Sequence, residues 1–259
     1  MTALHRLVVM LIAAFILAPI VVVVAASLSD SPLPEFPPRG LSLRWYVHAL
    51  NEPVFTVAAV NSLWLATVST ILATPLALAA AYGLMRGNFP GRDAMQTLLL
   101  APLVVPSLVI GLAILLAFSG IGIRDVGLRL VGAHVLITFP YMVRTILASL
   151  ARLDPVVEEA ARTLGASPFR TFLHVTLPLV RPGVIAGMLF AFIVSFDNVS
   201  VSLFLTSART NTLPLAILNY VEYNFDPSVA AISTMLIAFS LGAAVVMERL
   251  VGLRRVLGG

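Results

Sequence analysis

The sequence predicts an all-α membrane protein with six transmembrane helices, and three observations support this prediction. Of the 259 residues, 59% are hydrophobic and only 11% are charged, whereas soluble domains are roughly half apolar and a quarter charged. The mean hydropathy of +1.02 indicates that membrane lipid surrounds much of the chain. Six apolar segments can each cross the hydrocarbon core as a helix, and alternating strands of about ten residues are not evident.

The expected spans cover residues 7–28, 60–85, 96–118, 131–150, 183–205 and 229–251. The first span is 22 residues long, or about 33 Å as a helix. That is longer than the apolar part of a signal peptide, and no clear A-x-A cleavage site follows it. We therefore expect an uncleaved helix and an external loop in an N-terminal part, 1–57. A core of five helices, 58–251, and a tail, 252–259, would follow.

The positions of the arginines predict the orientation. With the N-terminus inside the cell, ten arginines fall in cytoplasmic segments and five fall in external loops. Cytoplasmic loops carry an excess of positive charge, so both termini are expected in the cytoplasm. This bias also accounts for the net charge of +4. No basic cluster with interleaved aromatic residues indicates a nucleic-acid partner.

Several motifs of catalysis and metal binding are missing from the sequence. The chain has no cysteine, so no disulfide or cysteine-based metal site is expected. It also has no lysine, which a Walker A loop needs, so any ATP would be bound by another subunit. The H-E-x-x-H and G-x-S-x-G motifs are absent. A lone histidine such as His134 is more often packed or interfacial than catalytic. We therefore expect no catalytic residue, metal site or cofactor in this chain.

The longest cytoplasmic connection, residues 151–182, carries strong helix signals. Its first helix is expected to begin at an N-cap, Asp154, with proline next, and to end where Gly165 takes the C′ position. A Ser-Pro pair repeats this start for a second short helix, which Pro178 would end. Both helices are amphipathic, so the loop is expected to hold a fixed shape against a partner.

This loop resembles the EAA loop of ABC importer permeases. The family pattern is Glu-Ala-Ala, a glycine four positions on, and a hydrophobic-x-Leu-Pro ending. The chain carries it as Glu159-Ala160-Ala161, Gly165 and Val175-Thr176-Leu177-Pro178, with valine where isoleucine is commoner. The alternative is an ordinary amphipathic loop that lies on the membrane.

The resemblance extends over roughly Leu41 to Leu241 and implies a type I importer permease in the bacterial inner membrane. The loop would be the coupling helix, which docks on a separate ATPase that binds ATP and Mg. The implied coupling residues are Glu158, Glu159, Ala160, Ala161, Arg162, Leu164, Gly165, Ala166, Leu177 and Pro178. The implied partners are a homologous second permease in a heterodimer, two ATP-binding subunits, and a periplasmic or extracellular solute-binding protein.

Asp197 is the one clear acidic residue expected well inside a span. A charge in lipid is costly and is by default a functional hypothesis, although a carboxylate that bonds to a neighbouring helix is the alternative. The surrounding Ser195-Phe196-Asp197-Asn198 resembles the second permease of the spermidine/putrescine branch, which implies an amine substrate. An anionic side chain in a passage of low dielectric constant suits a cation.

The chain departs from that branch in one respect. Polyamine permeases often have two adjacent carboxylates here, whereas Asn198 follows Asp197 in this chain. A singly charged or zwitterionic amine, similar to gamma-aminobutyrate or an aminoalkylphosphonate, is therefore an alternative substrate. The candidate substrate-path residues are Asp197, Asn198, Ser195 and Ser107. A secondary transporter driven by an ion gradient is the rival function, but inverted repeats and several midplane ionisable groups are not evident.

Overall fold

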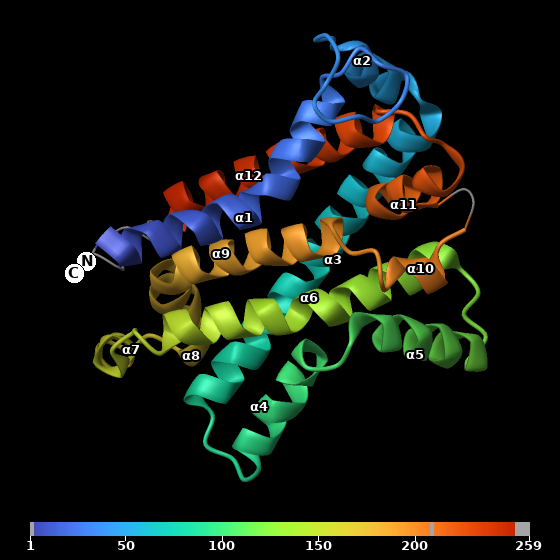
Figure 1. The fold of residues 1–259 in the computed structure, drawn as a ribbon. Helices are drawn as coiled ribbons and strands as arrows, with labels where there is room; N and C mark the ends of the chain where they lie inside the picture. Colours follow the sequence, from blue (N-terminus) through green and yellow to red (C-terminus); the bar gives the residue numbers. More distant parts are fainter. Residues whose placement is uncertain (1–2, 208–209, 252–259) are drawn as a thin grey trace. The chain divides into compact units, whose positions relative to one another are not determined.

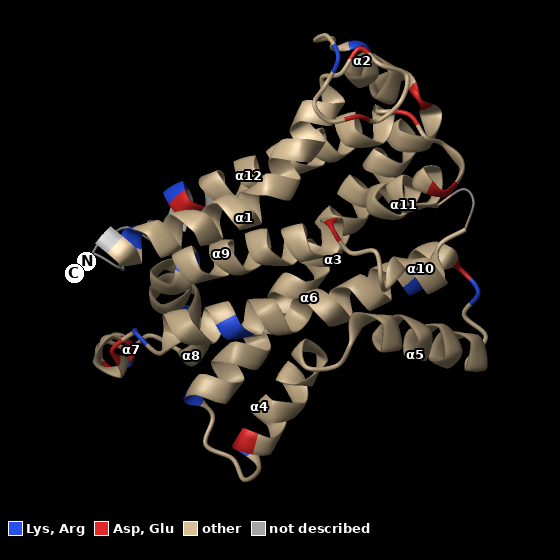
Figure 2. Ribbon diagram, in the orientation of Figure 1, with Lys and Arg blue, Asp and Glu red and all other residues tan. Residues whose placement is uncertain are grey.

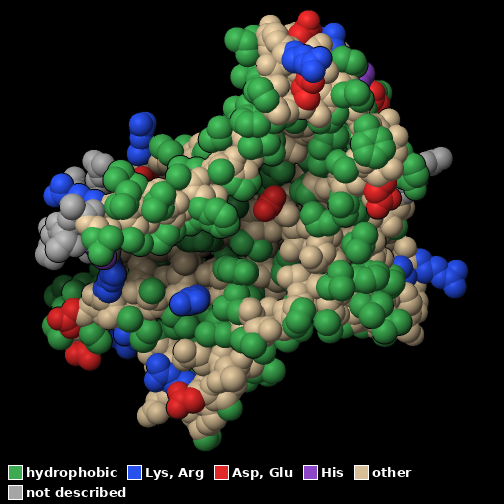
Figure 3. Space-filling view, in the orientation of Figure 1, with side chains coloured by type: hydrophobic (Ala, Val, Ile, Leu, Met, Phe, Trp, Pro, Cys, Tyr) green, Lys and Arg blue, Asp and Glu red, His purple; other side chains and the backbone are tan. Residues whose placement is uncertain are grey.

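The computed structural model describes residues 3–207 and 210–251, so the expected tail at 252–259 lies outside the described residues. The described residues form helices and connections without a β-strand (Figure 1). Five helices are long and apolar enough to cross a membrane, or six if one bent pair counts as a single span. This confirms the predicted all-α membrane fold. Most charged residues lie at helix ends and in connections (Figure 2), and hydrophobic side chains cover much of the face in Figure 3.

The chain forms two compact units, and each is described by itself. The first contains Met1–Ala59 and Leu213–Leu241, and the second contains Val60–Thr212 and Gly242–Gly259. Four long helices overlap the first, second, fourth and last expected spans, and the first three of them begin several residues earlier than expected. They are α1 (Ala3–Ser27), α3 (Pro53–Arg86), α6 (Val126–Leu150) and α12 (Ser228–Val251).

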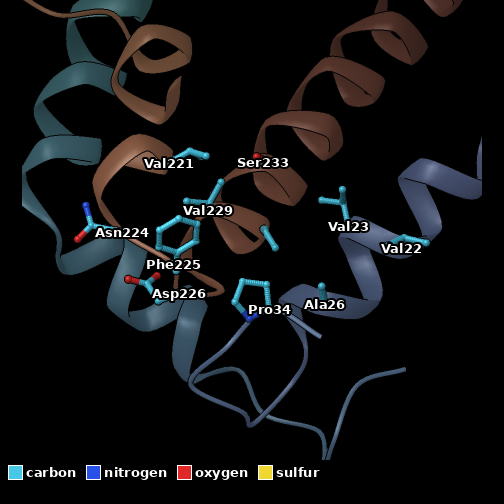
Figure 4. Close-up of a pocket in the computed structure, with 11 residues that line it drawn as sticks. Val22, Val23, Ala26, Pro34, Val221, Asn224, Phe225, Asp226, Val229 and Ser233 are labelled. Carbon is cyan, nitrogen blue, oxygen red and sulfur yellow. The ribbon is translucent and has the colours of Figure 1, made fainter. Parts of the chain in front are cut away.

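In the first unit, α2 (Arg44–Asn51) follows the external loop, and α11 (Leu213–Tyr223) precedes α12. The Tyr220 hydroxyl donates a hydrogen bond to Asp226 Oδ2 at 2.9 Å. Burial and this carboxylate raise the pKa of Tyr220 to about 12, so the phenol remains a donor at neutral pH. A pocket of about 280 Å³ lies between α1 and α12 (Figure 4), and its walls are mainly apolar.

In the second unit, α6 and α9 (Leu177–Phe196) run side by side (Figure 1) and share an apolar core with α3. Small residues allow the two helices to approach closely. A Cβ added at Gly183 would overlap the Ser149 side chain, and one at Gly187 would lie 2.6 Å from Thr145 Oγ1. Such small-residue contacts are the usual way in which helices associate in lipid.

The third expected span, 96–118, is not one straight helix. α4 (Arg92–Leu100) continues into a 3₁₀ turn, Ala101–Leu103, and α5 (Ser107–Gly120) then leaves at a bend of 101°. The physical reason is Pro106, which has no N–H to continue the helix and which disfavours helical geometry in the residue before it. The bent pair is the possible sixth span.

The fifth expected span, 183–205, is wrong at both ends. α8 (Pro168–Thr171) runs through a π-helical turn, Phe172–Thr176, directly into α9, so Pro178 does not end the second short helix. A wider π turn accommodates a proline whose missing N–H and bulky ring disturb regular α-helical bonding. At the other end, α9 stops at Phe196, and a separate turn of helix, α10 (Ser202–Leu205), follows the break.

Candidate functional site

The first helix of the coupling loop is α7 (Pro155–Thr163), and its predicted N-cap is present. Asp154 Oδ1 accepts a hydrogen bond from Val156 N at 3.0 Å. Ser167 caps α8 in the same way by accepting a hydrogen bond from Arg170 N. Both starts were predictable because the cap residue and the following proline are adjacent in the sequence.

Gly165 ends α7 in the left-handed conformation that its position predicts, with φ of 91°. Gly165 N donates to Arg162 O at 2.9 Å, and Ala166 N donates to Ala161 O at 3.1 Å. These two bonds form a Schellman motif, which satisfies carbonyl groups at the helix end. Ser167, the N-cap of α8, follows Ala166 directly, so the two helices are joined cap to cap.

The two adjacent glutamates of α7 lie in different surroundings. Glu158 is only 3% exposed, and its Oε2 accepts a hydrogen bond from Arg86 Nε at 2.7 Å in an ion pair. Its Oε1 accepts a hydrogen bond from Thr176 Oγ1 at 2.5 Å. Glu159 is exposed. Successive residues of a helix point to different sides, so one glutamate faces the protein and the other faces outward.

Exposed apolar side chains surround the cap-to-cap turn. Leu164 is 89% exposed, Phe169 71% and Val156 61%. Exposed apolar side chains on a structured loop are typical of an interaction surface. Of the other predicted coupling residues, Ala160, Arg162 and Pro178 are exposed, whereas Ala161, Ala166 and Leu177 are half-buried.

Asp197 lies at the break that ends α9, and not inside a helix as the sequence predicted. It is the C-cap residue of α9, and it is exposed. No hydrogen bond or ion pair joins its carboxylate to another of the described residues. The neighbouring Asn198 is already engaged, because its Oδ1 accepts a hydrogen bond from Val201 N at 2.8 Å. Asparagine often competes with helical bonding in this way, which explains why the helix stops here.

A buried histidine joins the two sides of this break. His134 Nδ1 lies 2.8 Å from Ser195 Oγ in α9, and His134 Nε2 lies 3.2 Å from Ser202 Oγ in α10. The sequence predicts a packed or interfacial rather than a catalytic histidine, and this geometry agrees with a packed one. From α5, the backbone at Gly111 approaches so closely that an added Cβ would lie 3.0 Å from Val201 Cα.

The structure brings three of the four predicted path residues together and leaves one apart. Ser195, Asp197 and Asn198 flank the break, but Ser195 Oγ and Asn198 Oδ1 have partners within the protein. Ser107 is the first residue of α5, and no hydrogen bond among the described residues joins it to the other three. Within residues 3–207 and 210–251, no group of three or more acidic or histidine side chains could hold a metal ion.

Residues 73–255 match the family of binding-protein-dependent transport system inner membrane components. The chain belongs to this family. The permease is 34% identical to the spermidine/putrescine transport system permease protein PotC of Haemophilus influenzae, over 82% of each chain. It is 32% identical to the putrescine transport system permease protein PotI of Escherichia coli, over 90% of this chain and 85% of that one.

The fold agrees with this assignment. The permease resembles a chain of a bacterial ABC transporter involved in the import of the acidic polysaccharide alginate, with a TM-score of 0.76 and 15% identity. The match covers 95% of this chain and 94% of that one. The predicted ABC importer permease is thus confirmed as a multi-pass transport subunit, not an enzyme, of a binding-protein-dependent system.

Proposed function

We propose that the permease forms half of the translocation path of an ATP-driven importer for amine cations of the putrescine and spermidine class. One observation carries the substrate class: at the break of the fifth span, Asp197 presents an exposed carboxylate that has no hydrogen-bond or ion-pair partner among the described residues. The PotC and PotI relatives, whose names specify spermidine and putrescine, support this choice.

The position of Asp197 strengthens its attraction for a cation. A helix carries a partial negative charge at its C-terminal end, and Asp197 directly follows the last residue of α9. The carboxylate and the helix end therefore favour the same sign of charge in a substrate. A hydrogen bond between an ammonium group and this carboxylate would contribute about 1.5–3 kcal/mol in a partly desolvated path.

A smaller amine is the second candidate substrate. Asn198 stands where the family resemblance implies a second carboxylate, and its amide oxygen already accepts a hydrogen bond from Val201 N. This chain therefore offers one carboxylate at the break, which matches one ammonium group better than several. A singly charged or zwitterionic amine similar to gamma-aminobutyrate fits that arrangement, and the partner permease would contact any further charge.

The coupling loop would dock on the ATPase through its outward side. Glu159 and the exposed Leu164 and Phe169 are the proposed contacts, with two ATPase subunits binding ATP and Mg and a heterodimer of permeases between them. An external binding protein would deliver the substrate. Family membership supports this arrangement over the ion-gradient alternative. Placement of both termini in the cytoplasm remains a prediction.

The test is uptake by the full complex with Asp197→Asn, which keeps the side-chain shape and removes the charge. We expect roughly ten- to hundred-fold weaker transport of labelled putrescine or spermidine, with the complex still assembled. Labelled gamma-aminobutyrate, tested in parallel, distinguishes the second candidate. The matched control is Asp93→Asn, an exposed aspartate in α4, which should leave uptake unchanged.

Three results would oppose this proposal. Unchanged uptake by Asp197→Asn would remove the support for an amine substrate. Loss of assembly would instead show that the carboxylate bonds to another helix in the complex. Uptake that continues without ATP but collapses with an ion gradient would favour the secondary-transport alternative.

A further inference from the structure

We propose that Glu158 is a positioning residue that transmits the movement of the coupling helix α7 to the membrane helices α3 and α9. The inference rests on the proposed docking of the coupling loop on an ATPase. The buried glutamate of α7 has a role different from that of the exposed Glu159, and it acts through Arg86 and Thr176, which are not among the predicted coupling residues.

The geometry divides one carboxylate between two elements. Oε2 accepts a hydrogen bond from Arg86 Nε at 2.7 Å, and Arg86 is the last residue of α3. Oε1 accepts a hydrogen bond from Thr176 Oγ1 at 2.5 Å, and Thr176 is the last residue of the π-helical turn that leads into α9. Arg86 Nη2 also donates to Leu153 O at 3.4 Å, just before the N-cap of α7. Glu158 and Arg86 together thus connect both ends of the coupling loop with α3.

A second contact runs parallel to this network. Tyr82 lies one turn before Arg86 on α3, and its ring packs edge-on against Phe172 with the centroids 4.9 Å apart. Phe172 begins the same π-helical turn that Thr176 ends. The end of α3 therefore holds the start of the fifth span through an aromatic contact and through the buried carboxylate.

Burial makes this connection stiff. Glu158 is 3% exposed and the Arg86 side chain 18%, so neither charge can replace its partner with bulk water while the elements stay packed. Removing one partner from a buried ion pair leaves an uncompensated charge, which is strongly unfavourable. When the ATPase pulls on α7, the least costly response is for the ends of α3 and α9 to move with it. Apolar side chains could fill the same space but would fix the direction of this motion less well.

The decisive experiment measures how many substrate molecules are transported per ATP hydrolysed. The full complex, with both permeases, the ATPase and the binding protein, is reconstituted in vesicles with labelled putrescine. Glu158→Gln keeps the volume of the side chain and removes its charge. We expect this ratio to fall about tenfold, the equivalent of ~1.4 kcal/mol in the linkage between the two steps. A role in folding alone would lower the amount of complex but leave the ratio unchanged.

Three further variants separate the contacts. Thr176→Val keeps the side-chain shape, adds no charge, and should lower the ratio less than Glu158→Gln. Arg86→Gln removes the other charge of the ion pair. The double variant with Glu158→Gln should lower the ratio little more than either single change, because both changes remove the same ion pair. Asp93→Asn in α4 removes an exposed carboxylate outside the coupling loop and is the control, which should leave the ratio unchanged.

An unchanged ratio in Glu158→Gln and Thr176→Val would overturn the inference, even if both complexes were less abundant. That result differs from a failure of the proposed function. If the unmodified complex bound no ATPase, or if its uptake did not depend on ATP, the docking role of the loop would fail first.

Discussion

At the scale of the residue, one imidazole holds the broken fifth span together. His134 is fully buried, and its two ring nitrogens contact hydroxyls on opposite sides of the break, Ser195 and Ser202. Hydrogen bonds between membrane helices contribute modestly, about 0.6 kcal/mol on average. Their importance here is positional, because the short segment between the two serines carries Asp197.

Replacing His134 with alanine should lower the free energy of unfolding by about 1–3 kcal/mol, since the buried Ser195 hydroxyl loses its partner and Ser202 keeps only its bond to Asn198 O. Thermal unfolding of the permease in detergent measures this change. His134→Gln retains a donor and an acceptor and should recover part of the loss. The exposed His5 provides the control, because His5→Ala should leave the unfolding temperature unaltered. Equal stability of the two alanine variants would contradict a bridging role.

At the scale of the element, the pairing of α6 with α9 depends on two glycines of α9, which have no side chain at the line of contact. Gly183 and Gly187 lie one turn apart on α9 and face Ser149 and Thr145 of α6. Lipid offers no hydrophobic driving force for helix association, so close backbone approach and packing must supply it. The two helices therefore tolerate little change in volume along this line of contact.

Gly183→Ala should destabilise the permease by about 1–3 kcal/mol, because the new methyl group would overlap Ser149. Gly83→Ala in α3 is the matched control, since an added Cβ there meets nothing within 4 Å. In a helix, alanine is favoured over glycine by roughly 0.5–1 kcal/mol, so this control should be neutral or slightly stabilising. Thermal unfolding of both variants decides the question, and a loss of equal size in both would rule out the packing explanation.

The sequence predicted the features of these helices that depend on residues adjacent in the chain. The caps at Asp154, Ser167 and Gly165 follow from a few adjacent positions, and the structure has all three. The sequence did not predict the break after Phe196. The segment 183–205 is apolar overall, and the single asparagine that ends the helix does not change that overall character. The contact of Glu158 with Arg86 joins positions 72 residues apart, and neither residue alone indicates its partner.

At the scale of the whole molecule, the permease is one component of a larger assembly. Its coupling loop leaves Leu164 89% exposed and Phe169 71% exposed next to a rigid turn. Lipid cannot account for these side chains if the loop lies in the cytoplasm, as the arginine distribution predicts. A protein partner that covers them is the simplest explanation.

Leu164→Asp should therefore weaken binding of the ATPase by roughly ten- to hundred-fold, the equivalent of the ~1.5–3 kcal/mol gained by burying a leucine. Co-purification of the ATPase with the tagged permease measures the effect. Leu41→Asp is the control, because Leu41 is 82% exposed but lies in the connection between α1 and α2. Normal recovery of the ATPase with Leu164→Asp would show that the partner binds elsewhere.

The cap-to-cap turn constrains the length of the coupling loop more tightly than it constrains which residues the loop contains. Ala166 completes the end of α7, and the very next residue begins α8, so no residue is free to absorb an insertion. One added residue would separate the two caps and turn α7 by about 100° relative to α8, since a helix has 3.6 residues per turn. Glu159 would then leave its outward position and Glu158 would leave Arg86. Many substitutions in this segment can preserve the contacts, but an insertion or deletion of a single residue cannot.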